Sequence, residues 1–218
     1  MRFFLTVLIA ALVVLCAFVV QKAISASRRR SAFPTEYEYG KECEMLVNSL
    51  LRSSFSRKSV LGNLYFPVVR GNDTLWTEVD VVCVTHGGIV VCEVKGAKGE
   101  IDNPLEGDWT QKYKDKELVF HNPYVQNKGH IVAVRNALER AGYRNIPLYN
   151  VVVFTDKAVR FTNRYSWLMR ADKVVEFTSR LDDKNDLKLK DIKMIRSALA
   201  AYKVKHEPTA AEQYRKVR

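Results

Sequence analysis

Asp80, Glu93 and Lys95 are residues whose types and spacing suit metal binding and charge stabilisation. They lie within Thr77–Lys95, where two apolar, β-branched runs flank a His-Gly-Gly sequence, a pattern that predicts a hairpin with a tight turn. With the turn centred between His86 and Gly87, each residue faces the one whose number brings the sum to about 173. Asp80 is then opposite Glu93, and period-two alternation points Lys95 to the same face. The opposite face is expected to carry Val79, Val81, Cys92 and Val94.

This hairpin predicts two carboxylates and an ammonium group inside strands that are apolar enough to be buried. A buried carboxylate pair repels itself, and an unpaired buried charge is costly. A hard divalent cation such as Mg²⁺, held by Asp80 and Glu93, would relieve both problems. Lys95 could then position a water or neutralise charge that develops on a phosphate. The alternative is a structural Asp/Glu–Lys salt bridge on the solvated face of a sheet.

A family resemblance begins at these residues. Asp80 followed by Glu93-Val94-Lys95 resembles the D…(D/E)xK signature of restriction-endonuclease-like nucleases, which is weak alone. Further motifs stand in the same order: Gly40-Lys41-Glu42-Cys43-Glu44, Glu78-Val79-Asp80, Gly99, Trp109 and Asn122-Pro123-Tyr124-Val125-Gln126-Asn127. The whole pattern is similar to the nuclease-related domain (NERD) family over roughly residues 38 to 140. The resemblance implies a nuclease that uses Mg²⁺ or Mn²⁺ to hydrolyse phosphodiester bonds, with DNA favoured over RNA as the partner.

The element before the hairpin is a predicted helix from Tyr39, with Met45, Leu46, Leu50 and Leu51 as its apolar stripe. In the resemblance, Glu44 matches the helix carboxylate that completes the metal site with Asp80 and Glu93. Glu42 is the alternative, because Cys43 stands where the family more often has glycine. Without the resemblance, glutamates in a first turn simply favour the helix dipole.

After the hairpin, Gly96 to His121 reads as a loop with short strands, in which Trp109 caps the core or stacks on a base. Asn122-Pro123 then starts a helix that is expected to reach about Ala141, with Pro suited to a first helical turn. Its core side is predicted as Val125, Ile131, Val132 and Leu138. The resemblance places Gln126 near the metal and phosphate, whereas His130 is only a weak catalytic candidate.

The remaining pattern predicts strands at Val60–Arg70, ending near Pro67, at Leu148–Thr155 and around Val174–Phe177, and a helix over Leu187–Val204. This order suits an α/β domain with a mixed central sheet flanked by helices. The resemblance specifies it as a restriction-endonuclease-like core. The expected organisation is an anchor over 1–21, a basic linker over 22–37, the nuclease-related domain over 38–205 and a charged tail over 206–218.

Phe3 to Val20 is an apolar run with Thr6 as its one polar residue, about as long as the shortest transmembrane helices. A single N-terminal transmembrane helix is favoured over a cleaved signal peptide, because Lys22 and three consecutive arginines follow the run. Those cations outnumber the positive charge before the run, so the soluble part is expected in the cytoplasm, anchored to the cytoplasmic membrane.

The 218 residues are 47% hydrophobic, which is enough for one domain with a well-packed core. The formal charge of +11 favours a polyanionic partner. The four cysteines lack metal-ligand spacing, and buried free thiols are expected for Cys83 and Cys92. Two other functions stay open: a nucleic-acid-binding module without catalysis, and a membrane-tethered protein scaffold. Loss of turnover in a folded Lys95→Ala variant is the result expected for the nuclease.

Overall fold

A computed structural model describes residues 36–71, 73–184 and 186–203. The elements below belong to the compact unit Tyr39–Arg218, apart from the start of the first helix. The predicted anchor at Phe3–Val20 and the charged tail lie outside the described residues. Among the residues that are described, no helix is both long enough and apolar enough to cross a membrane.

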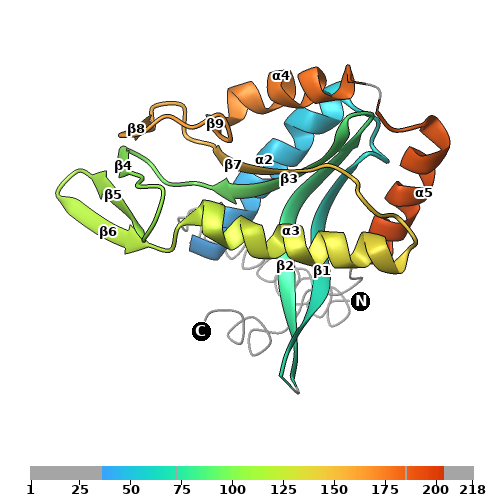
Figure 1. The fold of residues 1–218 in the computed structure, drawn as a ribbon. Helices are drawn as coiled ribbons and strands as arrows, with labels where there is room; N and C mark the ends of the chain where they lie inside the picture. Colours follow the sequence, from blue (N-terminus) through green and yellow to red (C-terminus); the bar gives the residue numbers. More distant parts are fainter. Residues whose placement is uncertain (1–35, 72, 185, 204–218) are drawn as a thin grey trace, which may run out of the picture. The chain divides into compact units, whose positions relative to one another are not determined.

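The centre of the fold is a mixed five-stranded sheet in the order β1-β2-β3-β7-β9 (Figure 1). Its strands are β1 (Val60–Arg70), β2 (Asp73–Thr85), β3 (Gly88–Lys95), β7 (Leu148–Phe154) and β9 (Leu168–Arg170). The β1–β2 and β2–β3 pairs are antiparallel, whereas β3–β7 and β7–β9 are parallel. The mixed α/β architecture expected from the sequence is therefore confirmed.

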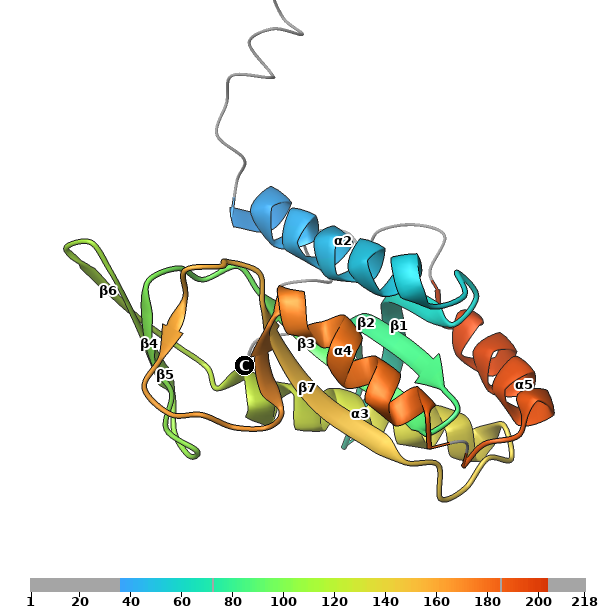
Figure 2. The same cartoon turned by 90° about the horizontal axis from the view of Figure 1, so that it is seen from above.

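Helices cover both faces of this sheet (Figure 2). One face packs against α2 (Glu36–Ser54) and α4 (Ala171–Asp182) in a first core, and the other packs against α3 (Pro123–Arg140) and α5 (Leu189–Ala200) in a second core. Asn122 caps α3, since its side chain accepts hydrogen bonds from the amides of Tyr124 and Val125. That cap fixes where α3 begins, and so where Gln126 and His130 stand.

Several predicted details of the helices were wrong. The predicted strand at Val174–Phe177 is part of α4, because Ala171, Val174, Thr178 and Leu181 are buried at helical spacing. In the stripe predicted for α2, Leu51 is buried beside Cys43 and Val47, but Met45 and Leu46 are exposed. In the core side predicted for α3, Leu138 is buried with Ala133, Val134 and Ala137, but Val125 and Val132 are exposed. Apolar residues on the solvent-facing side of a helix can produce the same hydrophobic spacing as a buried face.

The hairpin register is the one that the sequence predicted. The pairs run from Val81 with Cys92 to Thr85 with Gly88, which gives a constant sum of 173. The turn is held from outside: Asp182 accepts from the His86 amide, and a Cβ on Gly87 would lie 1.9 Å from the Leu181 carbonyl oxygen. Glycine is therefore required at that close approach.

The predicted facing of Val79 was wrong. Val81, Cys92 and Val94 lie in the first core, whereas Val79 lies in the second core with Val82. The ladder between β1 and β2 omits the pair Asn63–Asp80, and Asn63 has a left-handed φ of 55°. This local distortion breaks the period-two alternation along both strands.

A second sheet, in the order β6-β5-β4-β8, follows the hairpin. It contains β4 (Glu100–Asp102), β5 (Trp109–Tyr113), β6 (Lys116–Phe120) and β8 (Arg160–Phe161). Trp109 is fully buried in its core, and its Nε1 donates to the Pro104 carbonyl. This supports the prediction that Trp109 caps a core. Strand β1 continues through Pro67 to Arg70, which an edge strand tolerates because proline lacks only a donor.

Candidate functional site

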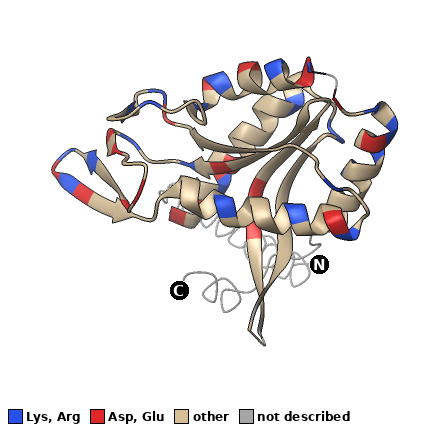
Figure 3. Ribbon diagram, in the orientation of Figure 1, with Lys and Arg blue, Asp and Glu red and all other residues tan. Residues whose placement is uncertain are grey.

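Charged residues interrupt the otherwise apolar central strands (Figure 3). At the strand distortion, Asp80 uses Oδ2 to accept a hydrogen bond of 2.9 Å from the Val94 amide of β3. Burial, followed by the negative charges of Glu93 and Glu44, raises the pKa of Asp80 well above its usual value. The Val94 amide and the Lys95 ammonium offset this only in part. Asp80 is thus a carboxyl group that its surroundings press toward the neutral form.

On one side of Asp80 lies a cluster of Glu93, Lys95, Gln126 and His130. It is named the buried cluster after Glu93 and His130, which are buried, whereas Lys95 and Gln126 are half-buried. Glu93 is 2% exposed, and its Oε1 is 2.7 Å from Lys95 Nζ. Lys95 also donates to Gln126 Oε1 over 3.1 Å, which connects the hairpin to the first turns of α3. The ammonium is therefore held between a carboxylate of β3 and an amide of α3.

The protonation of this pair follows from its geometry. Burial alone would raise the pKa of Glu93, but the Lys95 charge and the nearby His130 outweigh it, and the pKa is lowered. Burial alone would lower the pKa of Lys95, but the Glu93 carboxylate outweighs it, and the pKa is raised. Both groups are therefore charged at neutral pH.

His130 is buried on α3 and faces the same carboxylate. Its Nδ1 lies 3.3 Å from Glu93 Oε2, but the alignment falls short of a hydrogen bond. Across residues 36–71, 73–184 and 186–203, these two atoms and Asn127 Oδ1 are the buried side-chain polar atoms without a hydrogen-bond partner. One oxygen of Glu93 therefore retains unused acceptor capacity inside the protein.

On the other side of Asp80 lies an outer cluster made of Lys41, Glu44, Asn63 and Glu78. Lys41 Nζ contacts Glu44 Oε2 at 2.9 Å and also reaches Glu78 Oε1. Asn63 Nδ2 bridges the same two oxygens, at 3.1 and 3.0 Å. Burial is the largest influence on the pKa of Glu44, and despite the Lys41 contact it leaves that pKa raised. For Lys41, its two carboxylate partners outweigh burial and raise the pKa.

The sequence profile of the nuclease-related domain, NERD, matches residues 39–155, more than half of the protein. The chain belongs to the nuclease-related domain family. Neither a curated protein nor a solved structure matches it. The matched range contains every member of both clusters.

The NERD domain brings the residues singled out from its sequence into one neighbourhood. Asp80, Glu93 and Lys95 influence one another electrostatically, and Glu44 acts on both Asp80 and Lys95. Gln126 joins them through its hydrogen bond to Lys95. Glu42 is exposed and lines a separate cavity with Tyr39 and Lys98, so the geometry favours Glu44 over Glu42.

The donor chemistry of the NERD site suits a hard cation in part. The Asp80 carboxylate and the unused Oε2 of Glu93 supply carboxylate oxygens, the ligands that Mg²⁺ prefers. The third expected ligand, Glu44, already contacts Lys41 and Asn63. Among the residues placed by the structure, no group of three or more His, Cys, Asp or Glu side chains is arranged to hold a metal ion. The residues that fit a cation are therefore two carboxylates, Asp80 and Glu93.

Sequence reasoning missed Lys41, Asn63 and Glu78 and gave little weight to His130. Lys41 is three residues before Glu44, a spacing at which helical side chains meet. Glu78 is two residues before Asp80 in the same strand. A Gly-Asn pair inside a strand is the signal that could have indicated the distortion at Asn63.

Proposed function

We propose that this NERD protein is a metal-dependent nuclease that hydrolyses phosphodiester bonds, with DNA favoured over RNA. The observation that carries the proposal is the convergence of Asp80, Glu93 and Lys95 on the neighbouring strands β2 and β3 of a mixed sheet, in a chain of a nuclease-related family. Asp80 and Glu93 would hold Mg²⁺ or Mn²⁺, and Glu44 would complete the set. A bound cation supplies Lewis acidity toward the phosphate oxygen.

Lys95 has a defined role in this reaction. Water adds to phosphorus, a bridging P–O bond breaks, and the products are a phosphate monoester and a hydroxyl group, with the water's protons shared between them. Because Glu93 raises the pKa of Lys95, the amine stays protonated and cannot act as a base at neutral pH. It donates hydrogen bonds to the negative charge that develops on the phosphate, and Gln126 orients it.

We also propose a specific fold type for the domain and a cellular location for the protein. A restriction-endonuclease-like arrangement would account for the paired carboxylates at the end of the central hairpin. The apolar run Phe3–Val20 would anchor the protein in the cytoplasmic membrane with its domain in the cytoplasm.

Cleavage by the full chain tests this function. Plasmid, linear and single-stranded DNA, and RNA, are each incubated with Mg²⁺, Mn²⁺ or EDTA. Asp80→Asn is the main variant, because the site already favours a neutral group there and the fold should persist. We expect metal-dependent cleavage by the wild type and a loss of about 100-fold or more in the variant, the effect of removing one key charge-stabilising group. Equal cleavage by both proteins would contradict the assignment.

A second function is favoured by the state of Glu44. Because Lys41 and Asn63 already contact its carboxylate, the domain could bind nucleic acid without catalysing its hydrolysis. The mark of this alternative is salt-sensitive binding of nucleic acid by the wild type, with no cleavage in any metal. Isothermal titration with Mg²⁺ separates the two functions, since a binding module needs no heat of metal binding at Asp80.

A further inference from the structure

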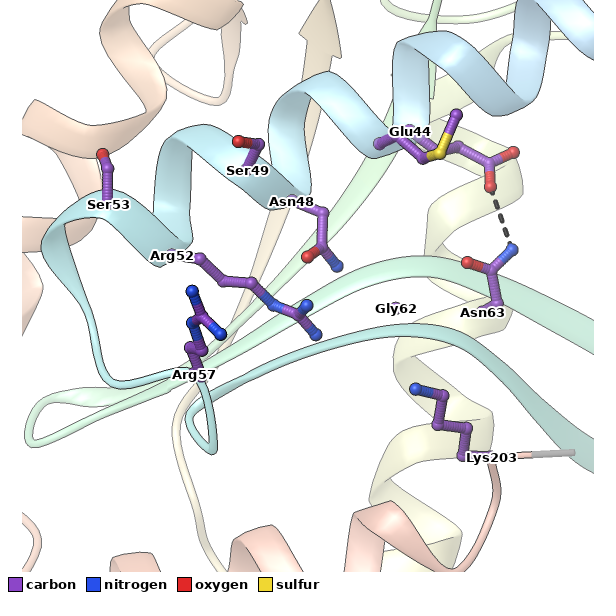
Figure 4. A pocket seen from close by; sticks show the side chains of 10 residues that line it. Glu44, Asn48, Ser49, Arg52, Ser53, Arg57, Gly62, Asn63 and Lys203 are labelled. Atoms are coloured by element: carbon purple, nitrogen blue, oxygen red, sulfur yellow. Dashed lines mark hydrogen bonds between the residues drawn. The ribbon is translucent and has the colours of Figure 1, made fainter. Parts of the chain in front are cut away.

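A groove of 650 Å³ runs beside the outer cluster, between α2 and β1 (Figure 4). This volume falls within the range of about 300–1,000 Å³ that is typical of ligand sites. On α2 the lining residues follow two rows with four-residue spacing, which begin at Glu44 and Met45, so that they share one helix face. The other lining residues are Arg57, Gly62, Asn63 and Lys203.

The groove is positively charged except at one end. Arg52, Arg57 and Lys203 line it, and none of the three forms an ion pair with a carboxylate in the part of the chain that the structure describes. Arg52 donates from Nη2 to the Val60 carbonyl, which fixes the guanidinium and leaves its other N–H groups for a ligand. Asn48 and Ser49 add uncharged polar groups.

The fold holds the opposite wall of the groove in place. The chain after α5 returns to β1, where Lys203 forms a bridge with Leu64 and the Tyr65 amide donates to the Tyr202 carbonyl over 3.0 Å. Tyr202 stacks on Phe66 with ring centroids 4.6 Å apart. Lys203 thus points into the groove from a backbone that β1 restrains (Figure 4).

The groove leads to the candidate site. Glu44 and Asn63 lie at one end of it, and Arg57 and Ser53 lie toward the other (Figure 4). Gly62, on its floor, pairs with Val81, the residue next to Asp80. From Glu44 to Ser53 the helix rises roughly 13 Å, at about 1.5 Å per residue. That length is sufficient for a short run of consecutive phosphates of one strand.

We propose that this groove binds the phosphodiester backbone of a nucleic-acid strand and leads it to Asp80 and Glu93. The inference rests on the proposed function only in naming nucleic acid as the anion. Three cations in a concave track match a row of phosphates, whereas a flat membrane surface would meet a convex basic patch. Guanidinium groups suit phosphate oxygens because they donate in a fork.

The test measures binding in EDTA, so that cleavage plays no part. Fluorescence anisotropy follows labelled single-stranded DNA, duplex DNA and RNA with the full chain over a range of salt concentrations. The groove variant is Arg57→Gln with Lys203→Gln, two exposed side chains. The matched control is Lys190→Gln with Lys193→Gln, which removes the same charge from exposed positions of α5 outside the groove lining.

We expect the groove variant to bind at least tenfold more weakly. The slope of log K against log salt should fall by about 1.8 for duplex DNA or about 1.4 for a single strand, the loss of two phosphate contacts. The control should keep the wild-type slope. An equal loss in both variants would mean that net charge alone is responsible and would overturn the proposal.

Two further outcomes distinguish nucleic-acid binding in the groove from the nuclease assignment and from binding of a lipid headgroup. If the groove variant loses binding but the wild type never cleaves in any metal, the groove stands and the nuclease assignment fails. If nucleic-acid binding is unchanged while binding to micelles that contain phosphatidylglycerol is lost, the groove serves a lipid headgroup and the proposal is wrong.

Discussion

The two clusters beside Asp80 contain similar groups, but the hydrogen bonding of their carboxylates differs. In the outer cluster, Lys41 and Asn63 both contact the two carboxylates Glu44 and Glu78. In the buried cluster, Lys95 contacts one oxygen of Glu93, and the other oxygen faces His130 without a hydrogen bond. In the outer cluster the contacted oxygens of Glu44 and Glu78 each accept from both Lys41 and Asn63, while the buried cluster keeps an acceptor in reserve. Such reserve is expected where a ligand completes the coordination, and it is costly otherwise.

Lys95→Met should give the largest effect on stability. The change leaves the Glu93 carboxylate, 3% exposed in its side chain, without its ammonium partner. Breaking one partner of a buried pair costs about 3–5 kcal/mol in the free energy of unfolding. Urea denaturation measures it, and a double variant with Glu93→Gln should recover much of the loss. If the double variant is no more stable than the single one, the pair is not the cause.

Lys41→Met should cost less, about 1.5–3 kcal/mol, the range for hydrogen bonds to charged groups. The carboxylates left behind, Glu44 and Glu78, are 15–16% exposed in their side chains against 3% for Glu93, so that water takes over part of the solvation. Asn63 also remains in contact with both carboxylates. A loss as large as that of Lys95→Met, measured in the same urea series, would remove the distinction between the clusters.

Asp80→Asn should stabilise the metal-free protein at neutral pH by about 1–2 kcal/mol, since the change removes a poorly solvated charge. The folded pKa of Asp80 is raised, so its stabilising contribution is full below the unfolded pKa of about 3.9 and is lost as pH rises. The gain from Asn should therefore be small near pH 4 and grow toward pH 7 in thermal melts.

Glu93→Gln is the matched contrast to Asp80→Asn. The folded pKa of Glu93 is lowered, so its stabilising contribution is present above the unfolded pKa of about 4.3 and is lost in acid. This variant should be destabilised at pH 7, and the deficit should shrink as pH falls. Parallel pH profiles for the two variants would contradict the opposite roles of the carboxylates.

Gln126→Leu should give the smallest effect on stability, about 1 kcal/mol, because it removes one hydrogen bond to Lys95. Under the proposed function, cleavage should fall several-fold, since Lys95 loses the group that orients it. Exchange at the exposed neighbour Val125, as Val125→Ala, serves as the control. Unchanged cleavage in Gln126→Leu would leave that side chain without a role in the reaction.

The sequence predicted the hairpin register because period-two alternation and turn chemistry are local. The mixed sheet was predicted from the order of the elements together with the family resemblance. The sequence also placed Glu93 beside Lys95, because the two residues are two positions apart in one strand. It failed at Val79 because a single left-handed residue, Asn63, on the neighbouring strand breaks the alternation. The contacts of Lys41 with Glu78 and of His130 with Glu93 join elements far apart in the chain, and local pattern carries no information on them.

The hydrogen bond from the Val94 amide to Asp80 has a spectroscopic consequence. A proton that faces a charged carboxylate resonates at lower field than one that faces a neutral amide or acid. In ¹⁵N-labelled protein, the Val94 cross-peak therefore reports the charge of Asp80 directly. Its position can be followed through a pH or Mg²⁺ titration, with Asp80→Asn as the neutral reference, without substrate and without turnover.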